Sequence, residues 1–162
     1  MNIMIPPRVY IETSVFGFYF DSHSYNAVRR AAVVRLFDQI EAGLITAVTS
    51  PVTEQELRRA PPELRPKLIA LLSAVNGIDA DERQVERLAR LYVSEGIVPI
   101  AYLDDARHLA YASVGGVEVV VTLNLKHLAN EWSERRANSV NLHEGYTLLS
   151  IRTPEEVIRY ED

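Results

Sequence analysis

The chain of 162 residues is long enough for one domain with a sizeable apolar core, and we expect a single domain over residues 1–162. Apolar residues make up 48% and charged residues 24%, which argues against disorder, and the lack of cysteine excludes disulfides, thiolate metal sites and cysteine nucleophiles. The net charge of −5 argues mildly against a module that holds nucleic acid through a broad basic surface, although clustered carboxylates in a nuclease account for the same deficit.

The sequence also bears on localisation. Its first residues lack the basic flank and long apolar run of a signal peptide. No apolar stretch approaches the roughly 18 residues that are needed to span a bilayer. We therefore expect a cytoplasmic protein that does not enter a membrane.

The first predicted elements are a strand and a helix. Residues 8–12 form a short β-rich run that is typical of a buried strand. Residues 17–26 are rich in turn formers and aromatics. A helix is then predicted from Asn26, a candidate N-cap, to Gly43, a candidate C-cap.

The middle of the chain repeats this order. Residues 44–50 are predicted to form a second strand, and Ser50-Pro51 carries the cap and first-turn proline of a second helix. Residues 61–75 predict another helix, bounded by Asn76-Gly77. Residues 80–96 are strongly amphipathic, with Gly96 as the stop.

The next segments lead to the clearest strand. Residues 97–102 are predicted to be extended, and a helix follows from near Asp104 to Gly115-Gly116. Residues 117–122 are β-branched and continuous, which favours a central, parallel strand.

The last segments complete an alternating pattern. Residues 123–132 are predicted to begin a helix, and residues 147–151 to form a last strand. Thr153 and Glu156 have the spacing of a capping box that opens a final short helix. Alternating strands and helices predict an α/β domain with a mainly parallel sheet.

Polar side chains follow several predicted strands. In an open α/β sheet, ligands bind beyond the carboxyl ends of the strands. The acids, amide and hydroxyls expected there are Glu12, Thr13, Ser14, Glu54, Glu56, Asp104, Asp105, Thr122 and Asn124. Clustered carboxylates repel unless a cation lies between them, and oxygen ligands suit Mg²⁺ or Mn²⁺. This arrangement is what metal-assisted phosphodiester hydrolysis requires.

Each of these positions also has a structural explanation. Glu12 can form a salt bridge with Arg8, and Glu56 can be a solvated helix residue. Asp104-Asp105 can cap a helix, and Asn124 can be a turn or cap residue. The coincidence of all four positions at one edge of the predicted sheet favours a site.

In their order, these motifs resemble those of the PIN-domain family. Residues 10–16, YIETSVF, resemble its first motif, and residues 49–57, TSPVTEQEL, resemble its second, with Glu56 directly before the leucine. Residues 103–130 are similar to the third and fourth motifs together, with Asp105 directly before the alanine. The tail, residues 145–161, resembles one subgroup, so the resemblance covers essentially the whole chain.

The resemblance implies a three-layer αβα sandwich and Mg²⁺- or Mn²⁺-dependent cleavage of RNA. Many bacterial members are VapC-like toxins, so it also implies a small antitoxin as partner and a homodimer. Carried over by position, Glu12, Glu56 and Asp105 are the metal-binding acids. Asp104 is an adjacent catalytic candidate that can bind a second ion or an ion-bound water.

The resemblance further implies that Thr13, Ser14 and Thr122 orient the acids through hydrogen bonds. Two positions depart from the family pattern. The first acid is Glu12 rather than aspartate, and the fourth acid is replaced by Asn124, which ligates only through a neutral carbonyl. The lost charge weakens the attraction for a second cation.

Other side chains near these motifs have two interpretations each. Lys126 can meet the substrate phosphate or be a solvent-exposed helix residue. The aromatic residues Phe16, Phe18, Tyr19 and Phe20 can stack on bases or fill a core or interface. His108 can contact Asp104 and Asp105 or be structural.

The predicted reaction is hydrolysis. A carboxylate oxygen of Asp105 or Asp104 would position a water and accept its proton. The resemblance implies that cleavage leaves a 5′-phosphate and a 3′-hydroxyl. One alternative is a PIN-fold RNA- or protein-binding module with weak or absent nuclease activity, for which Asn124 is the main support. A phosphoryl-transfer or receiver-type domain is disfavoured because Glu12, not an aspartate nucleophile, follows the first strand.

Overall fold

The computed structural model describes residues 5–160, in which short strands alternate with helices. The elements in chain order are β1 (Arg8–Ile11), α1 (Thr13–Tyr19), η1 (Ser24–Asn26), α2 (Ala27–Glu41), β2 (Thr46–Thr49), α3 (Pro51–Arg58), α4 (Arg65–Leu72), β3 (Asn76–Gly77), α5 (Glu82–Ser94), η2 (Ile100–Tyr102), α6 (Leu103–Val114), β4 (Val119–Val121), α7 (Glu131–Glu144), β5 (Ser150–Arg152) and α8 (Pro154–Val157). Residue 161, the last of the predicted motif at 145–161, lies outside the described residues.

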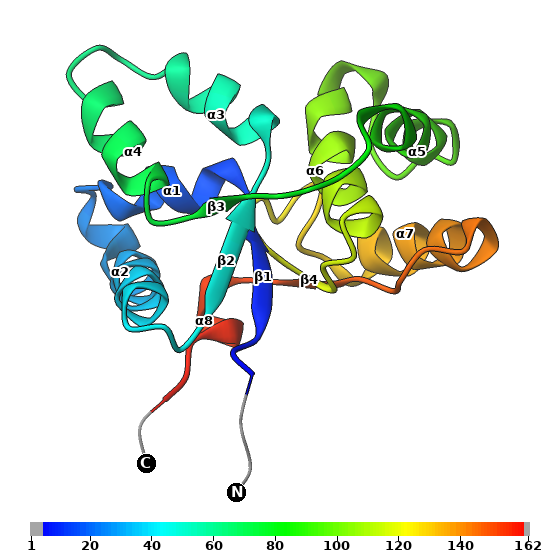
Figure 1. Ribbon diagram of the computed structural model, residues 1–162. Coiled ribbons are helices and arrows are strands. Elements are labelled where there is room, and N and C mark those ends of the chain that lie inside the picture. The colour runs from blue at the N-terminus through cyan, green and yellow to red at the C-terminus, as the bar shows by residue number, and fades with distance from the viewer. Residues whose placement is uncertain (1–4, 161–162) are drawn as a thin grey trace, which may run out of the picture.

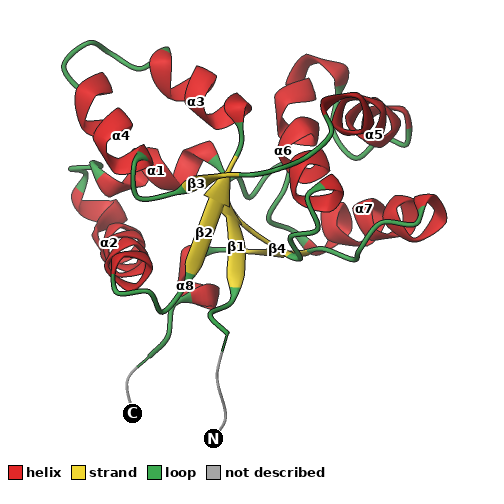
Figure 2. Ribbon diagram, viewed as in Figure 1, coloured by secondary structure: helices red, strands yellow, loops and turns green. Residues whose placement is uncertain are grey.

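The sheet has five parallel strands in the order β3-β2-β1-β4-β5. Val9 of β1 pairs with Ala47 of β2 on one side and with Val119 of β4 on the other. Helices α1 to α4 lie on one side of the sheet and α5 to α7 on the other (Figures 1 and 2). The predicted α/β class, with a parallel sheet in a three-layer αβα sandwich, is confirmed, and 117–122 supplies an interior strand as expected.

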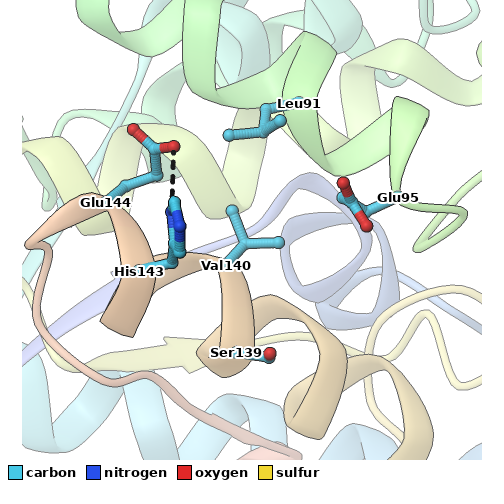
Figure 3. Close-up of a pocket in the computed structure, with 6 residues that line it drawn as sticks. All are labelled: Leu91, Glu95, Ser139, Val140, His143 and Glu144. Atoms are coloured by element: carbon cyan, nitrogen blue, oxygen red, sulfur yellow. Dashed lines mark ion pairs between the residues drawn. The ribbon is translucent and has the colours of Figure 1, made fainter.

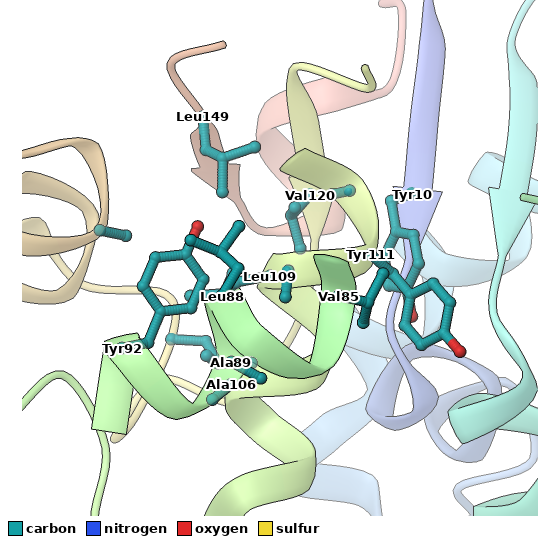
Figure 4. Close-up of a cluster of buried hydrophobic side chains, with 14 of the residues drawn as sticks. Tyr10, Val85, Leu88, Ala89, Tyr92, Ala106, Leu109, Tyr111, Val120 and Leu149 are labelled. Carbon is teal, nitrogen blue, oxygen red and sulfur yellow. The ribbon is translucent and has the colours of Figure 1, made fainter. Parts of the chain in front are cut away.

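Both faces of the sheet are buried, which explains the continuous apolar character of its strands. Tyr10 packs in a core with α5 and α6, whereas its neighbours Val9 and Ile11 pack in a second core with α2. Figure 4 shows the first core, where Leu88 and Leu109 from the two helices meet Val120 of β4. Adjacent residues of a strand point to opposite faces, so both faces must be covered by helices.

The residues predicted to start α3 and to end α5 lie at those helix ends. Ser50 caps α3 by accepting a hydrogen bond from the backbone N–H of Val52 at 3.2 Å. Gly96 follows α5 with a φ of 77°, a conformation that glycine adopts without a steric cost. Asn26 precedes α2 as predicted, but its side chain donates to Asp21 at 2.9 Å rather than capping the helix. Within residues 5–160, no helix has the length and apolar character to cross a bilayer.

Two elements were missed near the start of the chain and at the sheet edge. Residues 13–19, partly assigned to the turn-rich segment, form α1, because Glu12 caps its first turn and Phe16 is buried beneath it. Asn76-Gly77, expected only to end a helix, forms the edge strand β3. Two residues give no periodicity in the sequence, and pairing with β2 decides their conformation.

Two further expectations about the second half were wrong. Residues 97–102 are not extended throughout, because η2 forms a helical turn directly before α6. Residues 123–132 were predicted to be the beginning of a helix, but the helix starts only at Glu131, where Asn130 caps it by accepting from Ser133 N at 2.8 Å. Residues 123–130 are a loop, so Asn124 lies at the end of β4 in irregular backbone.

Candidate active site

The strand ends bring the predicted acids to one edge of the sheet. Glu12 follows β1 directly, and Asn124 follows β4, which is paired with β1. Glu56 projects from α3, which begins directly after β2, and Asp105 lies in the first turn of α6. Parallel strands end at the same edge, and α6, which follows η2 rather than a strand, reaches this edge through the contact of Asp105 with Asn124 (Figure 2).

Glu12 is a buried carboxylate with a full set of donors. The residue is 5% exposed. Its Oε1 accepts from the hydroxyls of Ser14 at 2.5 Å and Thr122 at 2.6 Å, and its Oε2 accepts from Ser14 N at 3.1 Å. These contacts agree with the orienting role inferred for Ser14 and Thr122. Arg8 begins β1 at the other end of the strand, so the alternative salt bridge is not the explanation for Glu12.

Glu56 is held by a histidine rather than being a freely solvated helix residue. His108 Nε2 lies 2.6 Å from Glu56 Oε1, and the Thr13 hydroxyl donates to the same oxygen at 2.9 Å. His108 Nε2 also lies 3.9 Å from Glu12 Oε2. His108 is thus placed between the two carboxylates, and Thr13 contributes to Glu56 as the resemblance implied.

A chain of hydrogen bonds continues behind His108. Its Nδ1 lies 2.7 Å from the Tyr10 hydroxyl, which lies 2.6 Å from the Ser50 hydroxyl. Both Tyr10 and His108 are fully buried. This chain links β1, the cap of α3 and the middle of α6, and so fixes the position of His108 relative to the strand ends.

Electrostatics favour charge on both members of the Glu56–His108 pair. Burial raises the pKa of the Glu56 carboxyl, but His108, together with the Thr13 hydrogen bond and the charge of Arg59, outweighs it and holds that pKa below its ordinary value. Burial lowers the pKa of His108, but Tyr10, Glu56 and Glu12 together raise it well above its ordinary value. Both pKa shifts favour the charged forms of Glu56 and His108, and they match the short contact between Glu56 Oε1 and His108 Nε2.

Asp105 belongs to a second group of polar side chains. Its Oδ2 lies 2.9 Å from His127 Nδ1 and accepts from the Asn124 amide at 3.2 Å. The side-chain oxygen of Asn124 accepts from the backbone N–H of His127 at 3.1 Å. Asn124 therefore orients Asp105, as a residue of the site, and also closes the loop after β4, as a turn residue. Both roles considered for Asn124 are thus present.

The two adjacent aspartates point to different partners. Asp104 Oδ1 pairs with Arg107 at 2.8 Å, and Arg107 also binds Glu86 of α5 at 2.9 Å. Asp104 and Arg107 line a surface cavity of about 350 Å³ that none of the three predicted metal ligands lines. Neither aspartate caps α6 through its side chain, because both are engaged elsewhere.

The remaining candidates lie apart from the carboxylates. Lys126 is exposed, in the loop before α7 rather than in a helix. The aromatic residues after β1 pack on the core beside α2, where Phe16 lies 5.4 Å from Phe37 between ring centroids. Phe18, Tyr19 and Phe20 are partly buried against the same core. Of the two roles considered for this aromatic group, the structure supports the core.

The donor chemistry at this edge fits a hard divalent cation, but the carboxylates are already engaged with protein donors. Glu12, Glu56 and Asp105 supply carboxylate oxygens of the kind that Mg²⁺ and Mn²⁺ bind. Within residues 5–160, however, no three His, Asp or Glu side chains are grouped as a metal site. Hydroxyl groups and His108 contact the carboxylates of Glu12 and Glu56, and His127 and Asn124 contact the carboxylate of Asp105.

Three of these partners were missed by the sequence analysis. Tyr10 was placed only within an apolar strand, His108 was given either a structural role or a contact with Asp104 and Asp105, and His127 was given no role. His108 lies three residues after Asp105, so helical spacing correctly placed it near the site but not against its actual partner. The pairing with Glu56 is made between α6 and α3 and has no signal in sequence spacing.

A cavity of about 260 Å³ lies elsewhere, between α5 and α7. Figure 3 shows its lining, with Leu91 on α5 and Glu95 directly after it, and with Val140 and His143 on α7. His143 Nδ1 lies 3.6 Å from Glu144 Oε1 within this lining. Its lining includes none of the residues at the strand ends.

Comparison with known proteins identifies the fold. The crystal structure of FitAcB from Neisseria gonorrhoeae superposes with a TM-score of 0.56 over 92% of this chain and 99% of that chain, at 16% sequence identity. The chain has a PIN-like fold. No protein-family model and no curated protein matches the sequence. The PIN-like fold is thus established by the arrangement of the elements, and the activity is a separate question.

Proposed function

We propose that this protein is a metal-dependent endoribonuclease that hydrolyses phosphodiester bonds of RNA. The observation that carries the proposal is the convergence of Glu12, Glu56 and Asp105 at the carboxyl edge of a PIN-like sheet. The ordered motifs that resemble the PIN-domain family include the same three residues. Neither the acids alone nor the fold alone carries this conclusion.

Glu12, Glu56 and Asp105 would hold Mg²⁺ or Mn²⁺, which supplies charge neutralisation at the phosphate and lowers the pKa of water. Thr122 and Ser14 hold the Glu12 carboxylate, and Thr13 and His108 hold Glu56. Preset side chains lose little freedom when they bind, which favours a tight site.

Asp105 is the candidate for proton transfer. Its carboxylate is oriented by His127 and Asn124, and it accepts the proton of the attacking water. The water oxygen bonds to phosphorus, the bond from phosphorus to the 3′ oxygen breaks, and the 3′ oxygen takes up a proton. The products are a 5′-phosphate and a 3′-hydroxyl. Asp104 has no part in this step, because it is paired with Arg107.

The same proposal includes the setting in which the enzyme works. By resemblance, we propose a cytoplasmic toxin that a small antitoxin inhibits and that forms a homodimer. Co-purification of a co-expressed neighbouring small protein, with loss of ribonuclease activity, would support the toxin role.

The deciding experiment is cleavage of a mixed single-stranded RNA pool with Mn²⁺, Mg²⁺ or EDTA. Wild-type protein is compared with Asp105→Asn and Glu12→Gln, and calorimetric Mn²⁺ titration of all three gives a readout that is independent of activity. We expect metal-dependent cleavage and heat of binding in the wild type and loss of cleavage in both variants. Full activity in either variant would remove that residue from the site.

A second candidate function is a binding module with weak or absent nuclease activity. The observation that favours it is that every predicted metal-binding carboxylate already has protein partners, and Asn124 acts as a donor to Asp105 rather than as a fourth acid. Folded wild-type protein that binds RNA but cleaves none with any metal would establish this alternative.

A further inference from the structure

An exposed aromatic ring lies beside the Asp105 group. Tyr102, the last residue of η2, is 49% exposed. Its ring lies 4.3 Å from that of His127 between centroids, with the planes tilted by 54°. His127 is largely enclosed, so the pair combines a fixed imidazole with a partly open phenol ring.

This pair is connected directly to the proposed catalytic carboxylate. His127 binds Asp105 through Nδ1 at 2.9 Å. Tyr102 also precedes α6, whose first turn carries Asp105. The Tyr102 ring therefore contacts His127, and His127 contacts the Asp105 carboxylate that is proposed to accept the proton of water.

Single-stranded nucleic acids bind proteins through bases that stack on aromatic rings. Such a contact strengthens binding by roughly five- to a hundred-fold per base, and it tolerates any base because every base has a π face. A base stacked at Tyr102 would hold its neighbouring phosphate close to Asp105. The aromatic residues after β1 do not serve this purpose, because they pack on the core beside α2.

We propose that Tyr102 and His127 form a stacking platform for one nucleobase of a single-stranded RNA substrate. This inference rests on the proposed function, because it places the base next to the phosphate that is cleaved. It assigns a substrate class, unpaired RNA, since a base within a duplex cannot offer its face to the ring.

The chain contains a matched control for this arrangement. Tyr25 is 80% exposed and lies 5.1 Å from His23 between ring centroids, and His23 Nδ1 lies 2.9 Å from Asp21. This second Tyr–His–Asp group precedes α2, which packs on the opposite face of the sheet from α6. It has the same local chemistry but lies away from the predicted acids.

The test measures binding without cleavage. Single-stranded RNA with one 2-aminopurine is titrated in EDTA with wild-type protein, Tyr102→Ala, Tyr102→Leu, Tyr102→Trp and Tyr25→Ala. Quenching of the fluorescent base reports stacking, and thermal melting checks that each variant is folded. We expect Tyr102→Ala and Tyr102→Leu to lose about ten-fold in affinity together with the quenching. Tyr102→Trp and Tyr25→Ala are expected to match the wild type.

Equal affinity and quenching in Tyr102→Ala would overturn the platform, as would failure of wild-type protein to bind the RNA. A loss in Tyr102→Trp equal to that in Tyr102→Ala would also overturn it, because an aromatic replacement must restore stacking. The outcome is separable from the proposed function. If RNA stacks at Tyr102 but no metal-dependent cleavage occurs, the nuclease proposal is refuted and the stacking platform stands. If the protein cleaves RNA and substitution of Tyr102 has no effect on binding, the platform is refuted and the nuclease proposal stands.

Discussion

His108 Nε2 lies 2.6 Å from Glu56 Oε1, which joins the middle of α6 to the helix that follows β2. The imidazole is fully buried and receives further support from the Tyr10 hydroxyl at 2.7 Å. Glu12 Oε2 lies 3.9 Å from the same nitrogen. A single buried imidazole, whose pKa these contacts raise, thus lies against two acids that would otherwise repel each other.

Replacing His108 is expected to destabilise the protein. His108→Leu removes the imidazole partner of both Glu56 and Tyr10 and leaves them only Thr13 and Ser50, and we expect a loss of about 2–4 kcal/mol in the free energy of unfolding. His108→Gln keeps an N–H donor and is expected to lose less. Urea denaturation of both variants measures the difference, and equal stability of His108→Leu and wild type would show that the pair contributes nothing.

The pH dependence of stability has opposite signs for the two partners. The pKa of Glu56 is lowered on folding, so its contribution is present above its ordinary value of 4.5 and is lost as pH falls through the folded value. The pKa of His108 is raised, so its contribution is complete below 6.5 and is lost as pH rises through the folded value. We expect the pair to contribute most between 4.5 and 6.5. Denaturation in EDTA across pH 4–9 measures this, and in His108→Gln the decline on the alkaline side is expected to be smaller.

Asp104 and Asp105 are expected to differ sharply in mutational effect. Asp104→Asn weakens an ion pair with Arg107 that is partly exposed, so stability changes by about 0–1 kcal/mol and RNA cleavage is retained. Asp105→Asn removes the proposed proton acceptor and is expected to lower kcat by at least about a hundred-fold. Steady-state cleavage of one RNA substrate compares the two. Equal loss of activity in both variants would restore Asp104 to the catalytic group.

Thr122→Val tests the support of Glu12. The Thr122 hydroxyl donates to Glu12 at 2.6 Å and accepts from Asn124 N at 3.0 Å, so valine leaves Glu12 with the donors of Ser14 alone and removes the acceptor of the Asn124 N–H. We expect a loss of about 1–3 kcal/mol in stability and about ten-fold in Mn²⁺ affinity. Calorimetry checks the affinity, with Thr46→Val at the start of β2 as a control that is expected to bind Mn²⁺ like the wild type.

Tyr92→Phe separates stability from function. The buried Tyr92 hydroxyl donates to Asn141 and contacts the Ser113 hydroxyl at 3.0 Å, in the core between α5, α6 and α7. Burial raises the pKa of Tyr92 far above its ordinary value, so the phenol stays neutral at ordinary pH. We expect the free energy of unfolding, measured by urea denaturation, to fall by about 1–3 kcal/mol. RNA affinity at low temperature is expected to be unchanged, and a fall in affinity would link this core to the site.

Local patterns in the sequence were sufficient to predict the α/β architecture. The β-branched run at 117–122 and the amphipathic repeat at 80–96 predicted an interior strand and a surface helix, and both are present. The strand Asn76-Gly77 was missed because two residues carry no periodicity. The start of α7 was placed too early because residues 123–130 are helix-compatible in composition, while their backbone bonds to Asn124 form turns.

The sequence by itself determined which acids follow the strands, because periodicity locates the strand ends and parallel strands end at one edge. Only the tertiary structure decided the partners of those acids. His108 reaches Glu56 across α6 and α3, His127 reaches Asp105 from the loop after β4, and Asp104 turns to Arg107 instead. The physical reason is that hydrogen bonds act over about 3 Å between residues far apart in the chain, so packing, not spacing, sets them.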